Sequence, residues 1–290
     1  MFKEKSASVG LIIGSILFGL GSIIVAKLPI GAYAIAFWRL AISGLAFLLL
    51  VWLLRTTLPK QKATCYYALL SGVFLAFDLA LWHESIYAIG PGISTLLNSL
   101  QIFWLTLIGL IWFKEKLNLY QIVSLFLAVV GVGLIASPEI AHNQQALWGF
   151  VSGLASGFFL ALSMVYVKKA QQTEPISIFV LMLLLSIGGM LALILPMYLF
   201  DSGKILPTTI HQLGWIIVYG LIMQCIAWGL IAYSIPLLSL SLTGLLLLSE
   251  PVAALLIDYF LLAKPINLVQ WCGALLTLIA IYLGILQRNK

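Results

Sequence analysis

Apolar residues fill nearly all of this 290-residue chain in about ten stretches of roughly 20 residues, separated by short charged or turn-forming breaks. A helix of that length crosses a bilayer core about 30 Å thick, whereas a transmembrane strand needs only about 10 residues. The pattern therefore predicts an all-α membrane protein with ten transmembrane helices, at 9–27, 33–54, 63–83, 91–113, 118–137, 146–167, 176–200, 212–233, 238–262 and 267–286. Only the boundary near Pro236 stays open.

Charge is scarce and unevenly placed along the chain. Only 8% of the residues are charged and 63% are hydrophobic, which excludes a water-soluble core. If the N-terminus is cytoplasmic, eleven Lys and Arg residues fall on the cytoplasmic side, three fall on the outer side, and Arg39 lies within the membrane. This asymmetry predicts an integral protein of the cytoplasmic (inner) membrane with both termini inside. Anionic lipid is a sufficient partner for the net charge of +6, so no nucleic acid is expected.

The two halves of the chain share a weak internal repeat. Residues 85–136 align with 234–285 at a constant offset of 149, and polar positions match at a helix start: Asn118, Leu119 and Gln121 fall on Asn267, Leu268 and Gln270. A unit of five helices ends on the side opposite to its start, so a second copy must be inverted, as in many transporters. We therefore expect two five-helix repeats, at 1–140 and 141–290.

Three sequence segments resemble one transporter family. They are Phe37-Trp38-Arg39-Leu40, the run from Leu248 to Leu256 that contains Ser249-Glu250-Pro251, and the repeated Asn-Leu-x-Gln segments. Together they resemble the EamA-type branch of the drug/metabolite transporter superfamily. The resemblance implies a ten-helix transporter of small metabolites, such as amino acids, choline-like compounds or nucleotide sugars.

The copies also differ. Ile102 stands where the second copy has Pro251, so a proline-dependent bend is expected in one half only, and Lys114-Glu115 corresponds to Ala263-Lys264.

Three charged residues are expected in one outer layer of the membrane. Counting about 1.5 Å per helical residue places Arg39 about 9 Å deep, Asp78 about 8 Å and Asp258 about 6 Å. Arg39 could then pair with one or both acids. This arrangement suits either a structural ion pair or an outer gate that breaks on opening, and direct substrate contact is a third reading.

Glu250 is the candidate coupling group. The same count places it about 18 Å from the outer end, near the midplane, with no basic residue predicted at its depth. A carboxyl there suits a proton carrier or a cation-binding group, or else a protonated group bonded to a neighbouring helix. Pro251 cannot donate a backbone hydrogen bond, so a kink is expected that frees the Leu247 carbonyl.

Amides and aromatic residues complete the predicted site. Gln101 is the repeat counterpart of Glu250, and Asn98 shares its helix face, so the two could orient a substrate or form interhelical hydrogen bonds. Gln224, Trp228 and Trp104 could add polar and aromatic walls, or simply pack.

The sequence therefore predicts a secondary transporter and not an enzyme. It moves an amino acid or a related amphipathic or cationic compound by alternating access, with proton coupling left open. The alternatives are an intramembrane enzyme or a channel-like facilitator, but the sequence shows no metal-ligand spacing, phosphate loop or repeated filter. No cofactor and no metal are expected. The expected partners are a small-molecule substrate and the lipid bilayer, with protons as the candidate coupling ion, and the chain is expected to be a monomer or a homodimer.

Overall fold

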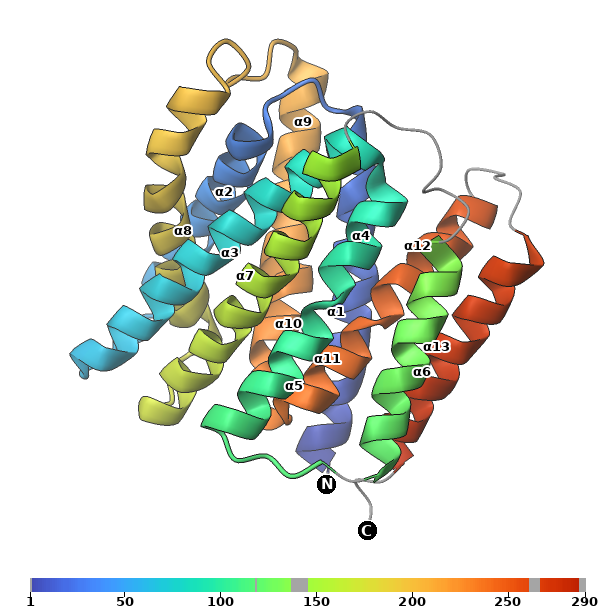
Figure 1. Cartoon of the computed structure of the whole chain (residues 1–290). Coiled ribbons are helices and arrows are strands. Elements are labelled where there is room, and N and C mark those ends of the chain that lie inside the picture. The colour runs from blue at the N-terminus through green and yellow to red at the C-terminus, as the bar shows by residue number, and fades with distance from the viewer. Residues whose placement is uncertain (1, 118, 137–145, 261–266, 287–290) are drawn as a thin grey trace.

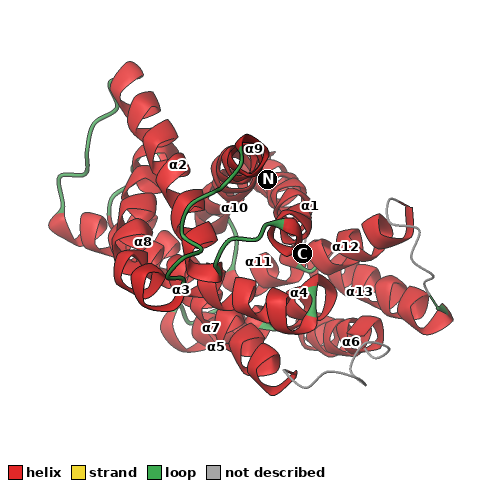
Figure 2. Ribbon diagram, turned by 90° about the horizontal axis from the view of Figure 1, so that it is seen from above, coloured by secondary structure: helices red, strands yellow, loops and turns green. Residues whose placement is uncertain are grey.

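The computed structural model describes all residues except 1, 118, 137–145, 261–266 and 287–290, and every regular element among the described residues is a helix (Figures 1 and 2). The elements are α1 (Phe2–Lys27), α2 (Ala32–Leu53), α3 (Lys62–Ile89), α4 (Pro91–Ser99), α5 (Gln101–Trp112), α6 (Leu119–Ala136), α7 (Ala146–Thr173), α8 (Ile178–Phe200), α9 (Ile210–Val218), the π-helix η1 (Tyr219–Trp228), α10 (Gly229–Ser234), the 3₁₀-helix η2 (Ile235–Leu237), α11 (Leu240–Leu247), α12 (Ser249–Phe260) and α13 (Leu268–Leu286).

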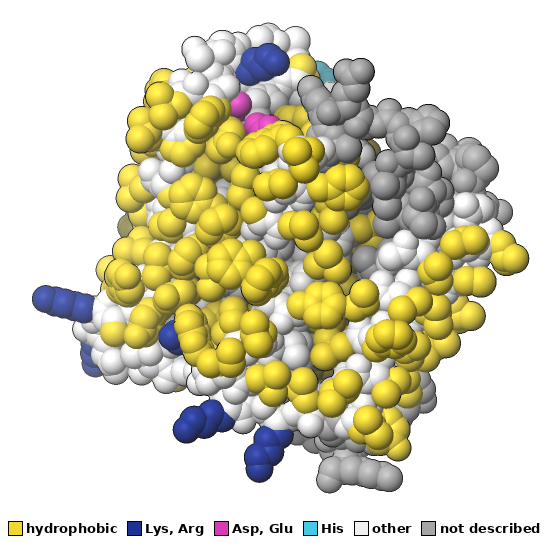
Figure 3. Space-filling view, in the orientation of Figure 1, with side chains coloured by type: hydrophobic (Ala, Val, Ile, Leu, Met, Phe, Trp, Pro, Cys, Tyr) yellow, Lys and Arg dark blue, Asp and Glu magenta, His cyan; other side chains and the backbone are white. Residues whose placement is uncertain are grey.

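The surface of the bundle is suited to lipid. Among the described residues, seven helices are long and apolar enough to cross a membrane, and three shorter apolar helices lie at Leu119–Gly131, Leu240–Ala253 and Leu268–Ala280. Apolar side chains cover the flank of the bundle in Figure 3, while Lys and Arg gather mainly at its lower end. The chain is therefore an integral membrane protein.

The predicted spans match helices, but their boundaries differ. The helices α3 and α7 continue to Ile89 and Thr173, each six residues beyond the predicted ends at 83 and 167. The spans at 91–113, 212–233 and 238–262 are each divided into shorter helices. The open boundary near Pro236 is the short η2 turn.

Two spans are broken near their middle. The helix α4 gives way to α5 at Leu100 (φ −67°, ψ −4°), and α11 gives way to α12 at Leu248 (φ −66°, ψ −6°). The expectation of a bend in only one half was therefore wrong. Pro251 is the third residue of α12, where a backbone N–H has no intrahelical partner in any case, so proline is not needed for the break.

Groups on neighbouring helices occupy the space beside each break. The Leu247 carbonyl accepts a hydrogen bond from Ser15 Oγ of α1 at 2.9 Å. At the other break, Gly157 of α7 leaves so little room that a Cβ there would lie 2.8 Å from the Asn98 carbonyl oxygen. Small residues on α1 and α7 thus allow these helices to approach the two interrupted spans.

The start of α1 and the end of α13 lie at the same end of the bundle (Figure 1). We call this the N-terminal end and the other the opposite end. In Figure 1, α6 and α13 lie side by side on the right, and they pack along each other. On the other side, α3 packs between α7 and α8, and α8 also packs on α2.

Close crossings between these helices depend on glycine. A Cβ at Gly188 of α8 would overlap the backbone of Leu69 on α3, and one at Gly72 of α3 would overlap the backbone of Leu185 on α8. Backbone cannot move aside as a flexible side chain can. Glycine at these two positions therefore permits the close approach of α3 and α8.

We expect Gly188→Ala to lower the free energy of unfolding by about 1–3 kcal/mol, because the added methyl overpacks the α3–α8 crossing. Gly214→Ala is the matched control, since a Cβ there meets nothing within 4 Å and the substitution should be neutral or stabilising. Thermal unfolding of the two purified variants in detergent checks this, and equal stability would show that the crossing tolerates a methyl group.

Candidate functional site

The centre of the bundle holds a fully buried cation. Arg39 of α2 has no exposed surface, and its guanidinium donates from Nε to Gln224 Oε1 at 2.7 Å, from Nη1 to the Tyr219 hydroxyl at 2.8 Å, and from Nη2 to the Met223 carbonyl at 3.4 Å. It also lies 4.5 Å from the centroid of the Phe18 ring, a favourable cation–π distance. Neutral groups therefore surround this charge.

A hydrogen-bonded chain continues from Arg39 to α3. His83 Nδ1 lies 2.9 Å from the Ala32 carbonyl oxygen, which can only accept, so Nδ1 carries a proton. His83 Nε2 lies 2.8 Å from the Tyr219 hydroxyl. Because this hydroxyl already accepts from Arg39, it can donate its own proton to Nε2 of a neutral imidazole. Every link in the chain is then satisfied.

The π-helix η1 presents one face to Arg39. In a π-helix, hydrogen bonds join residues five apart, so such residues lie nearly above one another. Tyr219 and Gln224 are five apart, and both bond to Arg39. Trp228, four residues further on, is buried on the same segment.

Phe18 of α1 lies at the middle of an aromatic group. Its ring centroid is 5.7 Å from that of Trp82 in a stacked arrangement, and 5.7 Å from that of Trp228 in a tilted one. The next residue, Gly19, faces Glu250, because a Cβ there would lie 2.8 Å from Glu250 Cγ. Arg39 and Glu250 therefore approach consecutive residues of α1.

This arrangement corrects the predicted depths. Arg39 and Glu250 contact consecutive residues of α1, whereas counting along the helices placed one in an outer layer and the other near the midplane with no basic residue beside it. The count assumed straight helices perpendicular to the membrane, and the break at Leu248 invalidates that assumption for the span that carries Glu250.

Asp78 does not form the predicted pair with Arg39. Among the described residues, Arg39 has no carboxylate oxygen within 4.0 Å, and Asp78 Oδ1 instead accepts from Asn98 Nδ2 at 2.8 Å. The same amide donates to Ser156 Oγ at 2.9 Å. The Asn98 amide can reach Asp78 because α4 packs against α3. The Arg39 guanidinium instead bonds to groups of η1. Asp258 lies on α12, but its side chain is outside the described residues.

Five buried polar atoms in and beside this centre have no partner in the described part of the protein. Three are donors, at Trp82 Nε1, Trp228 Nε1 and Gln224 Nε2, and two are acceptors, at Gln101 Oε1 and Glu250 Oε1. Buried polar atoms in native proteins are nearly always hydrogen-bonded, to protein, water or ligand. Each of these atoms is therefore available to a water molecule or to a ligand.

Of the remaining predicted site residues, Pro251 and Gln101 are buried and Trp104 is partly exposed. Pro251 is buried beside Glu250, and Gln101 begins α5 at the first break. Trp104 is 40% exposed and packs edge-on against Phe158, with ring centroids 5.0 Å apart, so it does not lie among the fully buried groups of the centre. Its place in the wall of the site stays a prediction. Gln101 is buried, whereas Trp104, three residues further along α5, is partly exposed. The sequence pattern did not distinguish the two.

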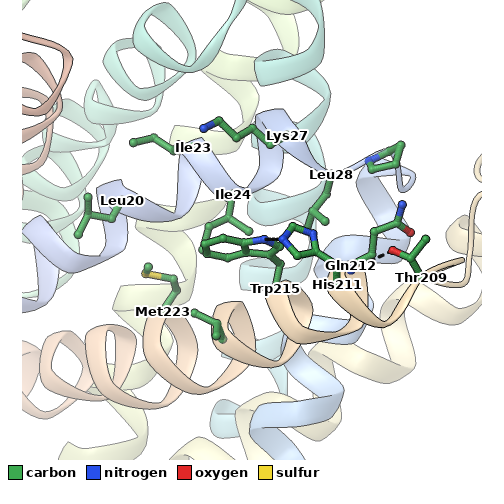
Figure 4. A pocket seen from close by; sticks show the side chains of 12 residues that line it. Leu20, Ile23, Ile24, Lys27, Leu28, Thr209, His211, Gln212, Trp215 and Met223 are labelled. Carbon is green, nitrogen blue, oxygen red and sulfur yellow. Dashed lines mark hydrogen bonds between the residues drawn. The ribbon is translucent and has the colours of Figure 1, made fainter. Parts of the chain in front are cut away.

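A hollow of about 610 Å³ lies between α1 and the α9–η1 segment, toward the opposite end of the bundle (Figure 4). Ile24, Leu28 and Trp215 form much of its wall, and the indole of Trp215 donates to His211 Nε2 at 3.1 Å. Met223 also lines it, and the Met223 carbonyl is one of the acceptors for Arg39. The hollow therefore ends beside the buried centre.

Several central residues were missed by the sequence analysis. Phe18, Tyr219 and His83 carry contacts of Arg39 or of its partners, yet each is an ordinary aromatic residue in an apolar span. The Tyr219 hydroxyl and the His83 imidazole, as polar groups within spans, were the only signal, and Phe18 carried none. Across the described ranges, no three His, Cys, Asp or Glu side chains gather as they would to hold a metal ion.

A buried polar centre inside apolar helices is the arrangement of a membrane transport protein. The EamA-like transporter family matches this chain over residues 5–137 and 147–286. The chain belongs to that family.

Relatives agree with this assignment. An uncharacterized transporter of Archaeoglobus fulgidus is 23% identical over 89% of this chain and 98% of its own length. The uncharacterized transporter YwfM of Bacillus subtilis is 26% identical over 96% of this chain and 93% of its own. A probable amino-acid metabolite efflux pump of Salmonella typhimurium is 25% identical over 47% of this chain and 46% of its own length.

A protein of known crystal structure has the same fold. It matches 98% of this chain and 96% of its own with a TM-score of 0.76, at 12% sequence identity. At that identity the likeness establishes the fold alone.

We expect Tyr219→Phe to lower the free energy of unfolding by about 1–3 kcal/mol, because it leaves Arg39 Nη1 and His83 Nε2 without their shared partner. Tyr233→Phe is the control, since Tyr233 follows on the same span and is 54% exposed. Thermal unfolding in detergent measures both variants, and an unchanged Tyr219→Phe protein would show that the hydroxyl does not stabilise the centre.

Proposed function

We propose that this protein is a secondary transporter that binds a small amino-acid-like metabolite at the Arg39–Glu250 centre and moves it across the cytoplasmic membrane by alternating access. The observation that carries the proposal is the set of unpartnered buried atoms, which includes both donors and acceptors. Membership of a transporter family supports the class of activity.

The proposed substrate class follows from the charges and unpartnered hydrogen-bonding groups of the buried residues. Arg39 supplies a cation, and the free N–H groups of Gln224 and Trp228 add donors, which together suit a carboxylate. The unpartnered acceptors Glu250 Oε1 and Gln101 Oε1 suit an ammonium group. An amino acid carries both groups on one carbon. The name of the Salmonella relative points to the same class.

The proposed topology has ten spans in two inverted five-helix units, at 1–140 and 141–290. The seven long and three shorter apolar helices support ten crossings. Exchanged contacts support the inversion: Gly10 of α1 packs on Ser234 of α10, and Ser85 of α3, the counterpart of Ser234 at the offset of 149, donates to the Gly149 carbonyl of α7 at 2.8 Å. The matching breaks at Leu100 and Leu248 support it as well.

We assign the N-terminal end of the bundle to the cytoplasm, because Lys and Arg are concentrated there. Single cysteines introduced at Ser6 and at Gln287, in a variant whose three native cysteines are replaced, should react with a membrane-impermeant maleimide only when the cytoplasmic face is exposed. Labelling of Gln287→Cys from the outside with Ser6→Cys inside would require an odd number of crossings and would contradict the inverted pairing.

Binding is tested with the purified protein against the free amino acids, with choline and nucleotides as comparison probes. We expect thermal stabilisation by at least one amino acid, and counterflow of that compound in proteoliposomes. Glu250→Gln should weaken the stabilisation and slow the counterflow, because it removes the negative charge expected to hold the ammonium group. Glu84→Gln is the matched control, since this carboxylate lies near the surface and bonds to Trp148 Nε1.

Proton coupling is tested in the same vesicles by imposing a pH gradient. If Glu250 carries the proton, the gradient drives accumulation in the native protein and in Glu84→Gln, and Glu250→Gln loses it. Gradient-driven accumulation at the native rate in Glu250→Gln would remove Glu250 from the coupling step. Stabilisation by choline but by no amino acid would contradict the proposed substrate class.

A further inference from the structure

A second buried charge cluster lies at the N-terminal end of the bundle, away from the hollow. Glu115, in the connection after α5, accepts from Lys168 Nζ of α7 at 3.2 Å. The same carboxylate accepts from the backbone N–H of Leu240 at 2.9 Å and from Ser241 Oγ at 3.2 Å. It therefore caps the N-terminus of α11, where a negative charge is favoured, and joins three separate elements.

The connection is shaped to place this carboxylate. Lys114 adopts φ 52°, a left-handed conformation that costs a non-glycine residue about 1–2 kcal/mol, and the Glu115 N–H then bonds back to the Gly109 carbonyl at 3.0 Å. A Cβ at Gly109 would lie 2.6 Å from Glu115 Oε2, so the missing side chain makes room for the carboxylate. A strained turn and a glycine together bring Glu115 back against the bundle.

Two lysines on α7 strengthen the contact. Lys168 Nζ also donates to the Leu238 carbonyl at 3.0 Å and lies 5.0 Å from the centroid of the Phe113 ring. The next residue, Lys169, lies 4.4 Å from the centroid of the Trp112 ring. Consecutive lysines of α7 thus hold consecutive aromatic residues at the end of α5.

The elements joined here are the half-helices that extend from the centre to this end. The helix α5 begins at the Leu100 break and runs to the N-terminal end, and α11 runs from that end to the Leu248 break. An opening of this end between α5, α7 and α11 has to break the cluster. The cluster holds all three together.

In the sequence, the second copy carries no carboxylate at the position equivalent to Glu115. The repeat offset of 149 places Lys264 at the position of Glu115 and Ala263 at that of Lys114. An ammonium group cannot accept backbone N–H donors, so it cannot cap a helix N-terminus. Asp201 does cap α2 at the opposite end, by accepting from the Ala34 N–H at 2.7 Å, but it joins α8 to α2 and not the walls of the hollow.

We propose that Glu115 and Lys168 form a one-sided latch that holds the N-terminal end closed, so that the resting protein is open at the opposite end. This inference rests on the proposed alternating-access function, because the latch is assigned to one of the two states of that transport cycle. Breaking the latch shifts the population toward the state that is open at the N-terminal end.

Two cysteine reporters in a variant without native cysteines test the latch, in lipid nanodiscs and without substrate. Met164→Cys lies one turn before Lys168 on the same face of α7 and is fully buried in the native protein. Ile24→Cys lines the hollow. We expect Glu115→Gln to raise the rate of maleimide labelling at Met164→Cys by about fivefold or more and to lower it at Ile24→Cys, because loss of a buried charge contact shifts a two-state equilibrium at least this far.

Glu174→Gln is the matched control. Glu174 lies at the same end and accepts from the N–H groups of Lys60 and Gln61, at 3.1 and 2.9 Å, but it does not contact α11. It should change neither rate. Unchanged labelling of Met164→Cys in Glu115→Gln would overturn the latch, and faster labelling at both reporters would show local unfolding instead of a shift between states. These rates require no substrate, so they are independent of the amino-acid and pH-gradient experiments that test the function.

Discussion

The structure depends on how a buried guanidinium is kept inside a membrane protein. An arginine at membrane depth must be surrounded by acceptors, and Arg39 finds them in a tyrosine hydroxyl, an amide oxygen and a backbone carbonyl, together with the faces of two aromatic rings. All three acceptors come from η1. The π-helical geometry of that segment brings Tyr219 and Gln224 to the same side, and this fixes the position of η1 against α2.

The broken spans give the centre its second constraint. Each break leaves backbone groups without helical partners, which membranes tolerate only where protein or a polar cavity surrounds them. Ser15 and Gly157 supply a hydroxyl and close backbone approach at the two breaks. The two interruptions have nearly the same dihedral angles although only one copy contains a proline. Packing by the facing helix therefore sets this geometry more than the local sequence does.

The two ends of the bundle differ in a way that the central symmetry does not require. One end is held by a carboxylate that caps α11 and pairs with Lys168, and the other contains a hollow that reaches Met223 beside Arg39. A transporter built from similar halves needs such a difference to favour one state, because equivalent halves would give states of equal energy. The copies differ in sequence at this point, with Glu115 in the first and Lys264 in the second.

The sequence by itself determined the all-helical membrane fold, because apolar runs of bilayer length permit little else, and it singled out Arg39, Asp78 and Glu250, because charge within a span is costly. It also indicated the family through short motifs. Only the tertiary structure decided which groups meet. Arg39 bonds to Gln224 and Tyr219 and not to Asp78, Asn98 takes that carboxylate, Trp104 is partly exposed, and Lys168 reaches Glu115. These outcomes depend on helix rotation, on the π-helical turn and on the two breaks, and a one-dimensional pattern of hydrophobic residues carries no information about the angle at which one helix faces another.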